Sequence, residues 1–329
     1  MQNRSIGQSG IQASVVALGG APISGWPWGE SDERQAVAAI HQCLEQGINL
    51  IDTAPVYGIG RSEELIGKAI AGRRDQVVLA TKCGLVWHVC DGTPFHQKLC
   101  GKSIYRYLGG ESIRYEIEQS LRRLNTDYID LYQTHWQDST TPISETMEVL
   151  LQLKQEGKIR AIGVSNCSLD QLKRYCASGS IDSTQEKYNM LHREVETDLA
   201  PFCAREGITL MAYTPLANGL LTGKVGATRT FASQDLRRDH PQFAPEIRCR
   251  VQELLHEMRP IAESYGATLG QLAIAWTVAQ PGVTYALVGT RTAEQACENA
   301  RAGFIRLRPR DLTILDEILI RHGITAIEL

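Results

Sequence analysis

Ionisable and amide-bearing side chains recur in this sequence at the ends of short apolar runs. Carboxylates, ammonium groups, imidazoles and phenols are the groups with which proteins move protons, and hydroxyls and amides orient bound ligands. A single such residue could simply be a polar strand end satisfied by a loop, but the recurrence predicts a site. The residues concerned are Asp52, Lys82, His135, Ser165, Asn166, Gln185 and Tyr213.

The apolar runs have the length and β-branched composition of strands, and longer stretches with helical spacing of apolar residues separate them. We expect eight strands, at residues 15–18, 50–51, 77–81, 128–134, 161–164, 183–188, 209–213 and 284–288. We expect helices at residues 32–46, 62–71, 110–124, 144–155, 169–176, 194–206, 247–265, 269–279, 293–301 and 310–321. One of these helices is inserted before the eighth strand.

Strands that alternate with helices predict a parallel sheet, because parallel neighbours need a crossover connection. Eight such units favour an α/β fold of the (β/α)8 TIM barrel type, formed by residues 1–329 as one domain. The alternative is a doubly wound sheet, which normally carries a GxGxxG turn after its first strand. The turn here reads Gly19-Gly20-Ala21-Pro22.

In a parallel barrel the carboxyl ends of all strands meet at one face, so the polar residues above can share one pocket. Two long segments, 85–109 and 220–243, also follow strand ends. Loops of this length are uncommon unless they have a function. We therefore expect them to cover the pocket.

Composition narrows the class of protein. The chain has 329 residues with 34 Lys and Arg against 37 Asp and Glu, a net charge of −3, and no basic block that would suit nucleic acid. No apolar run approaches the ~20 residues of a membrane span, and the first residues do not resemble a secretory signal. Nine cysteines without a CxxC pair fit reduced thiols. We expect a cytoplasmic protein that binds neither nucleic acid nor membrane; the oligomeric state is not indicated.

A cluster of soft ligands lies in the first long segment and could hold zinc. Its spacing follows no CxxC pairing, and we interpret it as pocket lining, with no metal expected. The residues are Cys83, His88, Cys90, His96 and Cys100.

Several motifs occur in a fixed order along the chain. They are GINLIDTAPVYGIGRSEELIG at 47–67, ATK at 80–82, LYQTHW at 131–136, GVSN at 163–166, QxxYN at 185–189 and GTRTAEQACENA at 289–300. In this order the sequence resembles the aldo-keto reductase family of NADPH-dependent barrel enzymes, over nearly the whole chain. It is most similar to the microbial branch with YGxGxSE after the active-site tyrosine.

The resemblance implies a catalytic tetrad of Asp52, Tyr57, Lys82 and His135. Carbonyl reduction needs a proton donor close to the oxygen that becomes negative, and Tyr57 fits this role. A free phenol has a pKa of about 10, so we expect the Lys82 ammonium to lower the pKa of Tyr57. Asp52 would keep Lys82 protonated, and His135 would orient the substrate oxygen. The alternative roles are a rim aromatic, a structural ion pair and a core histidine.

The resemblance also implies a site for NADPH or NADP+. Ser165, Asn166 and Gln185 would bind the nicotinamide carboxamide, and Tyr213 would stack on the ring. The segment that wraps the pyrophosphate would include Thr214, Pro215, Leu216, Gly219 and Leu221.

The last motif would bind the adenosine end of the cofactor through Gly289, Thr290, Arg291, Gln295 and Asn299. Thr292 and Gln295 have the spacing of a capping box, whose helix N-terminus favours an anion. Arg291 beside it would pair with the 2′-phosphate, which predicts NADP rather than NAD. The alternative is a surface arginine paired with Glu294 or Glu298. Arg229, Arg237 and Arg238 are left without an assigned role.

We therefore expect an NADP-dependent aldo-keto reductase that reduces an aldehyde or ketone to an alcohol. An aromatic rim that includes Trp26, Trp87 and Trp136 would accept a small-molecule carbonyl substrate. No arginine is clearly placed to bind a charged group of that substrate. The alternatives are an NAD(H)-dependent polyol or sugar dehydrogenase on the same scaffold and a cofactor-binding regulatory subunit with little turnover.

Overall fold

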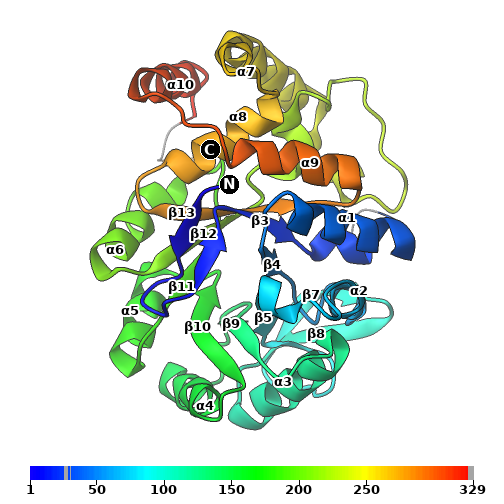
Figure 1. Cartoon of the computed structure of the whole chain (residues 1–329), viewed down its shortest axis with the longest axis vertical. Helices are drawn as coiled ribbons and strands as arrows, with labels where there is room; N and C mark the ends of the chain where they lie inside the picture. The colour runs from blue at the N-terminus through cyan, green and yellow to red at the C-terminus, as the bar shows by residue number, and fades with distance from the viewer. Residues whose placement is uncertain (26–28, 30, 325–329) are drawn as a thin grey trace.

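The computed structural model describes residues 1–25, 29 and 31–324. In this part of the chain eight parallel strands close into a barrel in which each pairs with the next along the chain and the last pairs with the first (Figure 1). The strands are β3 (Val16–Gly19), β4 (Leu50–Asp52), β5 (Val78–Cys83), β9 (Ile129–Thr134), β10 (Ile159–Ser165), β11 (Ser183–Lys187), β12 (Thr209–Tyr213) and β13 (Val283–Gly289). The predicted (β/α)8 barrel is confirmed, and the doubly wound sheet is excluded.

Helices surround the barrel and connect its strands (Figure 1). They are α1 (Glu33–Glu45), α2 (Arg61–Ala69), α3 (Gly110–Leu124), α4 (Ile143–Gln155), α5 (Leu169–Ser178), α6 (Leu199–Glu206), α7 (Pro245–Ser264), α8 (Leu269–Ala279), α9 (Ala293–Ala302) and α10 (Pro309–Arg321). The extra helix before the last strand is confirmed, because α7 and α8 both lie between β12 and β13. The helix expected at 194–206 is divided into a 3-10 turn, Glu194–Glu196, and α6.

The barrel interior is filled by alternate residues of its strands, among them Leu50, Val78 and Leu131. Ile6 and Ile11 join this interior cluster. They belong to the N-terminal hairpin of β1 (Asn3–Ser5) and β2 (Gln12–Ser14), which the sequence did not predict. The hairpin thus closes the amino end of the barrel with apolar side chains.

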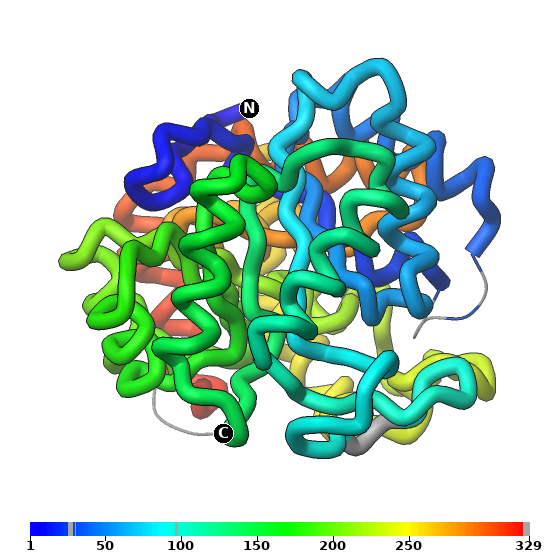
Figure 2. Tube along the Cα trace, turned by 90° about the horizontal axis from the view of Figure 1, so that it is seen from below, coloured from blue at the N-terminus to red at the C-terminus, as the bar shows by residue number. Residues whose placement is uncertain are grey.

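The two long segments lie at the opposite end from this hairpin (Figure 2). The first was expected to be a loop, but it contains an antiparallel sheet of β6 (Leu85–Val86), β7 (Thr93–Leu99) and β8 (Lys102–Arg106). The second contains the 3-10 turns Leu236–Arg238 and Pro241–Phe243. Further 3-10 turns lie at Ala21–Ser24, Arg74–Gln76 and Ala217–Thr222.

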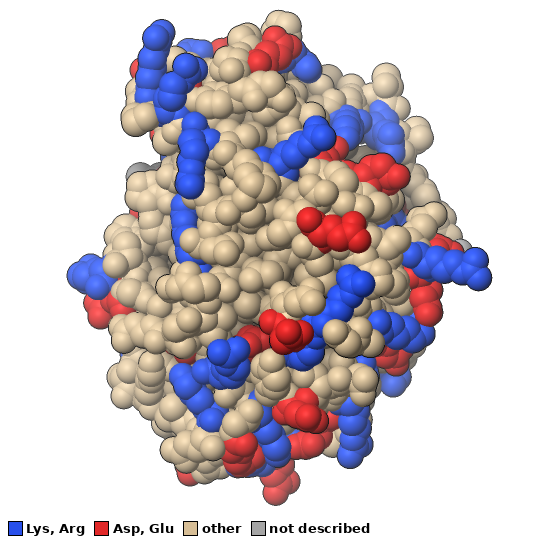
Figure 3. Space-filling model, viewed as in Figure 1, with Lys and Arg blue, Asp and Glu red and all other residues tan. Residues whose placement is uncertain are grey.

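The surface carries both signs of charge. Lys and Arg side chains are spread among Asp and Glu over the face in Figure 3, in agreement with the small net charge of −3. Within the described ranges, every helix is too short or too polar to span a membrane.

Two buried carboxyl groups hold the loops that follow barrel strands. Glu116 of α3 accepts the N–H of Gly84 with both oxygens, each at 3.1 Å. Glu186 of β11 accepts the N–H of Cys167 at 3.0 Å and the hydroxyl of Thr184 at 2.7 Å. Burial raises the pKa of Glu116 to about 8 and that of Glu186 to about 7.

The raised pKa of Glu186 predicts a pH dependence of stability. Because the folded state favours the protonated carboxyl, the free energy of unfolding contributed by this group falls as the pH rises from about 4.5 to about 7. A glutamine cannot ionise, so the Glu186→Gln variant does not lose stability in this way. The unfolding free energy of the variant minus that of wild type should therefore be about 3 kcal/mol larger at pH 8 than at pH 5. Urea titrations of both proteins at the two pH values measure it. Equal differences at both would show that Glu186 does not titrate in this range.

Candidate active site

The inward-facing residues at the carboxyl ends of the strands form a polar layer above the apolar interior. Side chains alternate along a strand, so Lys82 points inward with Val78 and Ala80. The same alternation places Asp52 above Leu50. Other inward positions of this layer are Gln133, Ser165, Gln185 and Tyr213, and the strand pairing sets Lys82 opposite Gln133 and Ser165 opposite Gln185. The predicted strand-end residues therefore share one face of the barrel.

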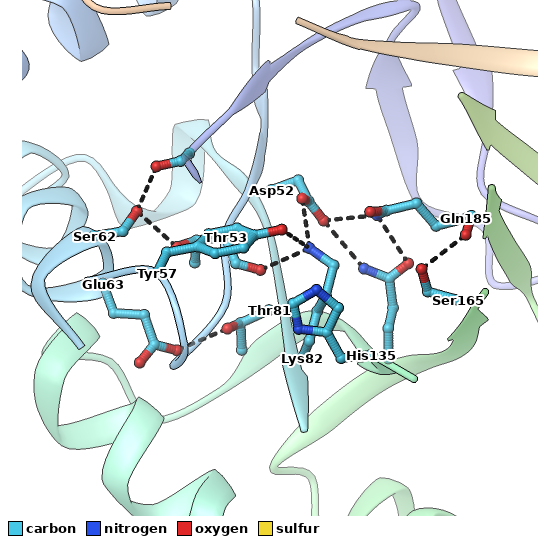
Figure 4. A network of polar contacts seen from close by, with 12 residues as sticks. Asp52, Thr53, Tyr57, Ser62, Glu63, Thr81, Lys82, His135, Ser165 and Gln185 are labelled. Atoms are coloured by element: carbon cyan, nitrogen blue, oxygen red, sulfur yellow. Dashed lines mark hydrogen bonds and ion pairs between the residues drawn. The ribbon is translucent and has the colours of Figure 1, made fainter. Parts of the chain in front are cut away.

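The centre of this layer is an ion pair between Lys82 and Asp52. Both side chains are almost completely excluded from solvent, and Lys82 Nζ lies 2.6 Å from Asp52 Oδ2. Nζ also donates to the carbonyl of Thr53 at 2.9 Å and to the hydroxyl of Tyr57 at 3.5 Å (Figure 4). Burial lowers the pKa of Lys82, but Asp52 and Tyr57 outweigh it, so the net shift is upward and the ammonium is retained.

The second oxygen of Asp52 is held by two amides. Gln185 donates to Oδ1 at 2.9 Å and Gln133 at 3.2 Å. Gln133 was not predicted as a site residue, although it lies two residues before His135 and so has the same inward orientation as that histidine. With three donors on its two oxygens, Asp52 is fixed in one orientation toward Lys82.

Tyr57 lies in the turn between β4 and α2. The turn is closed by backbone bonds from Gly60 to Pro55 at 2.6 Å and from Ser62 to Tyr57 at 3.2 Å. Gly58 has φ +65°, and a Cβ there would lie 2.7 Å from Ser24 Cβ. The glycine is therefore required for the backbone path that turns Tyr57 toward Lys82.

His135 stands beside the tyrosine, with the two rings edge to face and their centroids 5.6 Å apart. Burial and the nearby Lys82 ammonium hold the pKa of His135 well below its usual value. The imidazole is therefore neutral at neutral pH and offers one N–H donor. Burial raises the pKa of Tyr57 above its ordinary value, while Lys82 opposes this shift. The expected lowering of the Tyr57 pKa is wrong because desolvation of the phenolate exceeds the effect of the ammonium.

Ser165, Asn166 and Tyr213 form a hydrogen-bonded group next to the tetrad. Asn166 has φ +54° and donates to the carbonyl of His135 at 2.8 Å and to Ser165 Oγ at 3.1 Å. The hydroxyl of Tyr213 donates to Asn166 Oδ1 at 2.8 Å. Ser165 Oγ in turn donates to the carbonyl of Gln185 at 2.7 Å. These bonds fix the Tyr213 ring beside the tetrad.

A cavity of about 610 Å³ opens over this layer. It is lined by most of the residues expected from the sequence: Asp52, Tyr57, His135, Trp136, Ser165, Asn166, Gln185, Tyr213, Thr214, Pro215, Leu216, Gly219, Gly289, Arg291, Gln295 and Asn299. It is also lined by residues that were not predicted from the sequence, including Gly20, Pro22, Asn218, Lys224, Arg229, Arg237 and Glu298. The turn after β3 lacks a GxGxxG motif, so its position at this face was not predicted.

Some expected residues lie away from the cavity wall. Lys82 is beneath Tyr57, and Leu221 is fully buried in the outer core. Thr290 is buried and accepts a hydrogen bond from Asn299 at 3.1 Å. Trp87 packs with Leu85 and Phe95 under the antiparallel sheet. Trp26 lies outside the described residues.

The segment after β12 turns sharply along the cavity. Thr214, Ala217 and Asn218 have φ of 55°, 46° and 54°, a left-handed conformation that is uncommon outside glycine. The backbone N–H groups of Gly219 and Leu221 both donate to the carbonyl of Leu216, at 2.9 and 3.2 Å. These two N–H groups are therefore already hydrogen-bonded within the chain. What the segment offers a ligand is a backbone that can approach it closely.

Basic residues gather at the end of the cavity formed by β13 and α9. Lys224, Arg229, Arg237 and Arg291 all line it, while Arg238 pairs with the exposed Asp239.

The start of α9 at this end differs in detail from the expected capping box. Thr292 accepts from the N–H of Gln295 at 3.3 Å, but the side chain of Gln295 accepts from the N–H of Arg291 at 2.8 Å. Glu298, one possible partner of Arg291, pairs with Lys224 at 3.2 Å.

The Cys- and His-rich segment is dispersed in the fold. Cys83 is buried, whereas Cys90 and Cys100 are exposed. Among the residues that the structure describes, no three His, Cys, Asp or Glu side chains are grouped as metal ligands would be.

Known proteins share this sequence and architecture. The chain is 42% identical over 294 residues to aldo-keto reductase YhdN of Bacillus subtilis, covering 88% of this chain and 85% of that protein. It is 40% identical over 324 residues to the NADH-specific methylglyoxal reductase of Escherichia coli, covering 97% and 98%.

Solved structures agree with this likeness. The glycerol dehydrogenase AKR11B4 of Gluconobacter oxydans superposes with a TM-score of 0.89 at 36% identity, over 99% of this chain and 97% of that one. An aldo-keto reductase of Klebsiella pneumoniae in complex with NADPH superposes with a TM-score of 0.72 at 29% identity, over 97% and 96%.

The model of the Aldo/keto reductase family matches residues 16–320, the stretch that holds the whole barrel and its polar layer. This chain belongs to the aldo/keto reductase family and is an oxidoreductase that acts on carbonyl compounds.

Proposed function

We propose that this protein reduces an aldehyde or ketone to an alcohol, with Tyr57 as the proton donor and a nicotinamide dinucleotide as the hydride source. The observation that carries the proposal is the contact of Lys82 Nζ with both Asp52, at 2.6 Å, and the Tyr57 hydroxyl, at 3.5 Å. Reduction leaves negative charge on the substrate oxygen, and a donor held near that oxygen removes it.

Each residue of the tetrad has a separate task in this proposal. Tyr57 is protonated at neutral pH because burial raises its pKa, so its hydroxyl carries the proton that is transferred to the alcohol product. When the proton leaves, the Lys82 ammonium stabilises the phenolate, and Asp52 keeps Lys82 in place. The neutral His135 donates its one N–H to the carbonyl oxygen and orients it.

The chemistry of the cavity fits a nicotinamide dinucleotide. Near the tetrad, amide and hydroxyl groups of Ser165, Asn166 and Gln185 suit a carboxamide, and the Tyr213 ring suits stacking. At the other end basic side chains suit phosphates. The buried hydroxyl of Thr214 has no partner within the described residues, as expected of a group that a ligand completes. When bound, the cofactor supplies the hydride.

We further propose that NADP(H) is the preferred form, because Arg291 beside the N-terminus of α9 offers a charge for the 2′-phosphate. The relative solved with NADPH supports this preference. A second candidate is an NAD(H)-dependent dehydrogenase of a polyol, which is favoured by the names of the NADH-specific relative and the glycerol dehydrogenase.

Two broader proposals follow from the same observations. Residues from both halves of the chain line one cavity, which supports residues 1–329 acting as one domain. All nine cysteines are free thiols, which supports a reducing compartment such as the cytoplasm.

The proton-donor role predicts the effect of Tyr57→Phe. This change keeps the ring and its packing but removes the proton, so kcat for an aromatic aldehyde should fall by about 10²–10⁴-fold, while the cofactor Kd changes little. Stopped-flow hydride transfer and fluorescence titration of the cofactor measure the two effects. Undiminished turnover would contradict the role of Tyr57, and a wild type that binds cofactor but reduces no carbonyl in a broad panel would favour a regulatory subunit.

The cofactor preference predicts the effect of Arg291→Ala. Loss of a charge-assisted contact with the 2′-phosphate should raise the Kd for NADPH by about 10–100-fold and the Kd for NADH by less than about 3-fold. Arg238→Ala is a matched control, because this arginine pairs with Asp239 and does not line the cavity. An unchanged Kd for NADPH, or equal losses for both cofactors, would remove the basis for the NADP preference.

A further inference from the structure

The antiparallel sheet over the active site carries an arginine with an unusual environment. Arg106 is the last residue of β8, where it pairs in register with Leu85 of β6 and Thr93 of β7. Its guanidinium carbon lies 4.9 Å from the centre of the Trp136 ring and 5.1 Å from that of Phe95. The two rings are themselves 5.8 Å apart. The side chain is thus held against two aromatic faces, which favour a cation.

The chain itself does not neutralise this cation. Two other partly buried arginines are ion-paired, Arg74 with Asp130 at 2.7 Å and Arg123 with Glu63 at 2.6 Å, whereas Arg248 donates to the backbone carbonyls of Gly226 and Arg229. Within the part of the chain that the structure describes, no carboxylate pairs with Arg106, and its Nε is buried without a hydrogen-bond acceptor. A desolvated donor without an acceptor is destabilising. Such a group is retained most readily where a ligand completes it.

The position of Arg106 relates it to the carbonyl site. Trp136, on which the guanidinium is packed, directly follows His135 and lines the cavity. Tyr57, Trp136 and Phe95 all pack on one apolar cluster that joins the sheet to the Tyr57 turn. Arg106 therefore lies against the back of the cavity wall at Trp136, although its own side chain is not among the residues that line the cavity. Lys224, Arg229, Arg237 and Arg291 line the cavity itself, with Lys224 paired to Glu298 and Arg237 to Asp235, and we assign this basic group to the cofactor phosphates.

We propose that Arg106 binds an anionic group of the substrate, so that the preferred substrates are aldehydes or ketones that carry a carboxylate or a phosphate. This rests on the proposed function, since the carbonyl of the same molecule reacts at Tyr57 and His135. The planar guanidinium presents N–H groups that match two oxygens of either anion. The aromatic rings hold it in place, so little side-chain freedom is lost on binding.

Two matched substrate pairs test the proposal. The first is 4-carboxybenzaldehyde against its neutral methyl ester, and the second is glyceraldehyde 3-phosphate against glyceraldehyde. Wild type should prefer the anionic member of at least one pair in kcat/KM, and the pair that responds distinguishes carboxylate from phosphate. Arg106→Leu should lower the anionic-to-neutral ratio of kcat/KM by about 10–100-fold, mainly through KM of the anionic substrate.

Two further variants separate recognition from structure. Arg106→Lys keeps the charge without the planar pair of donors and should restore only part of the preference. Lys102→Met is the control, because this exposed lysine lies on the same strand but over Trp87, 5.7 Å from its ring centre, and it should leave the ratio within about 3-fold of wild type.

The outcomes that overturn the inference are distinct from those that overturn the proposed function. If Arg106→Leu lowers kcat/KM equally for both members of each pair, the arginine is structural. If wild type reduces the neutral substrates as well as the anionic ones, Arg106 does not select. Failure of wild type to reduce any of the four carbonyls with either cofactor would instead count against the proposed function. Thermal melting and cofactor titration of each variant identify those that have lost their fold.

Discussion

The buried ammonium of Lys82 is the constraint on which the rest of the site depends. A lysine that is fully removed from water loses its charge unless an anion and further acceptors replace the solvent. Asp52 supplies the anion at 2.6 Å, and the carbonyl of Thr53 supplies a second acceptor at 2.9 Å. The remaining donor of Lys82 is then directed at Tyr57, which is why a phenol at this position differs from one on the surface.

The hydrogen bonds that stabilise the Lys82–Asp52 ion pair extend across the barrel. The second oxygen of Asp52 requires donors, and it receives them from Gln133 of β9 and Gln185 of β11. The backbone carbonyl of Gln185 accepts a hydrogen bond from the hydroxyl of Ser165, and this hydroxyl accepts one from the Asn166 amide. The groups that suit a nicotinamide and those that suit a carbonyl oxygen are thus parts of one hydrogen-bonded layer.

Local pattern and strand topology were sufficient to predict most of this arrangement. All eight barrel strands were located. The alternation of side chains along each strand then places Asp52, Lys82 and His135 on the same inward face. Gln133 was not predicted because a single glutamine within a buried strand matches no sequence motif. Its role becomes visible only when the pairing of β5 with β9 places it opposite Lys82. The upward shift of the Tyr57 pKa was likewise not predictable, because it depends on how completely the turn excludes water.

The elements that the sequence missed are those defined by distant contacts. The N-terminal hairpin is too short to show a periodic pattern, and it is stabilised by packing Ile6 and Ile11 into the open end of the barrel. The sheet within 85–109 carries few β-branched residues, and its pairing depends on the surface formed by the Tyr57 turn and Trp136. Arg106 acquires its aromatic surroundings only through this pairing, so the sequence alone offered no arginine for a charged substrate.

The seam of the barrel has a consequence for synthesis of the protein. β3 pairs with β13, and Val16 lies opposite Ala286. The first barrel strand therefore cannot complete its pairing until the last strand has been synthesised. Until β13 has left the ribosome, the barrel is open along one edge and its inner polar layer is in contact with water. The part of the cavity lined by Gly289, Arg291 and Asn299, which we propose binds the adenosine of the cofactor, is also synthesised last. A nascent chain therefore cannot use cofactor binding to stabilise an early intermediate, and a ligand can support only the nearly completed fold.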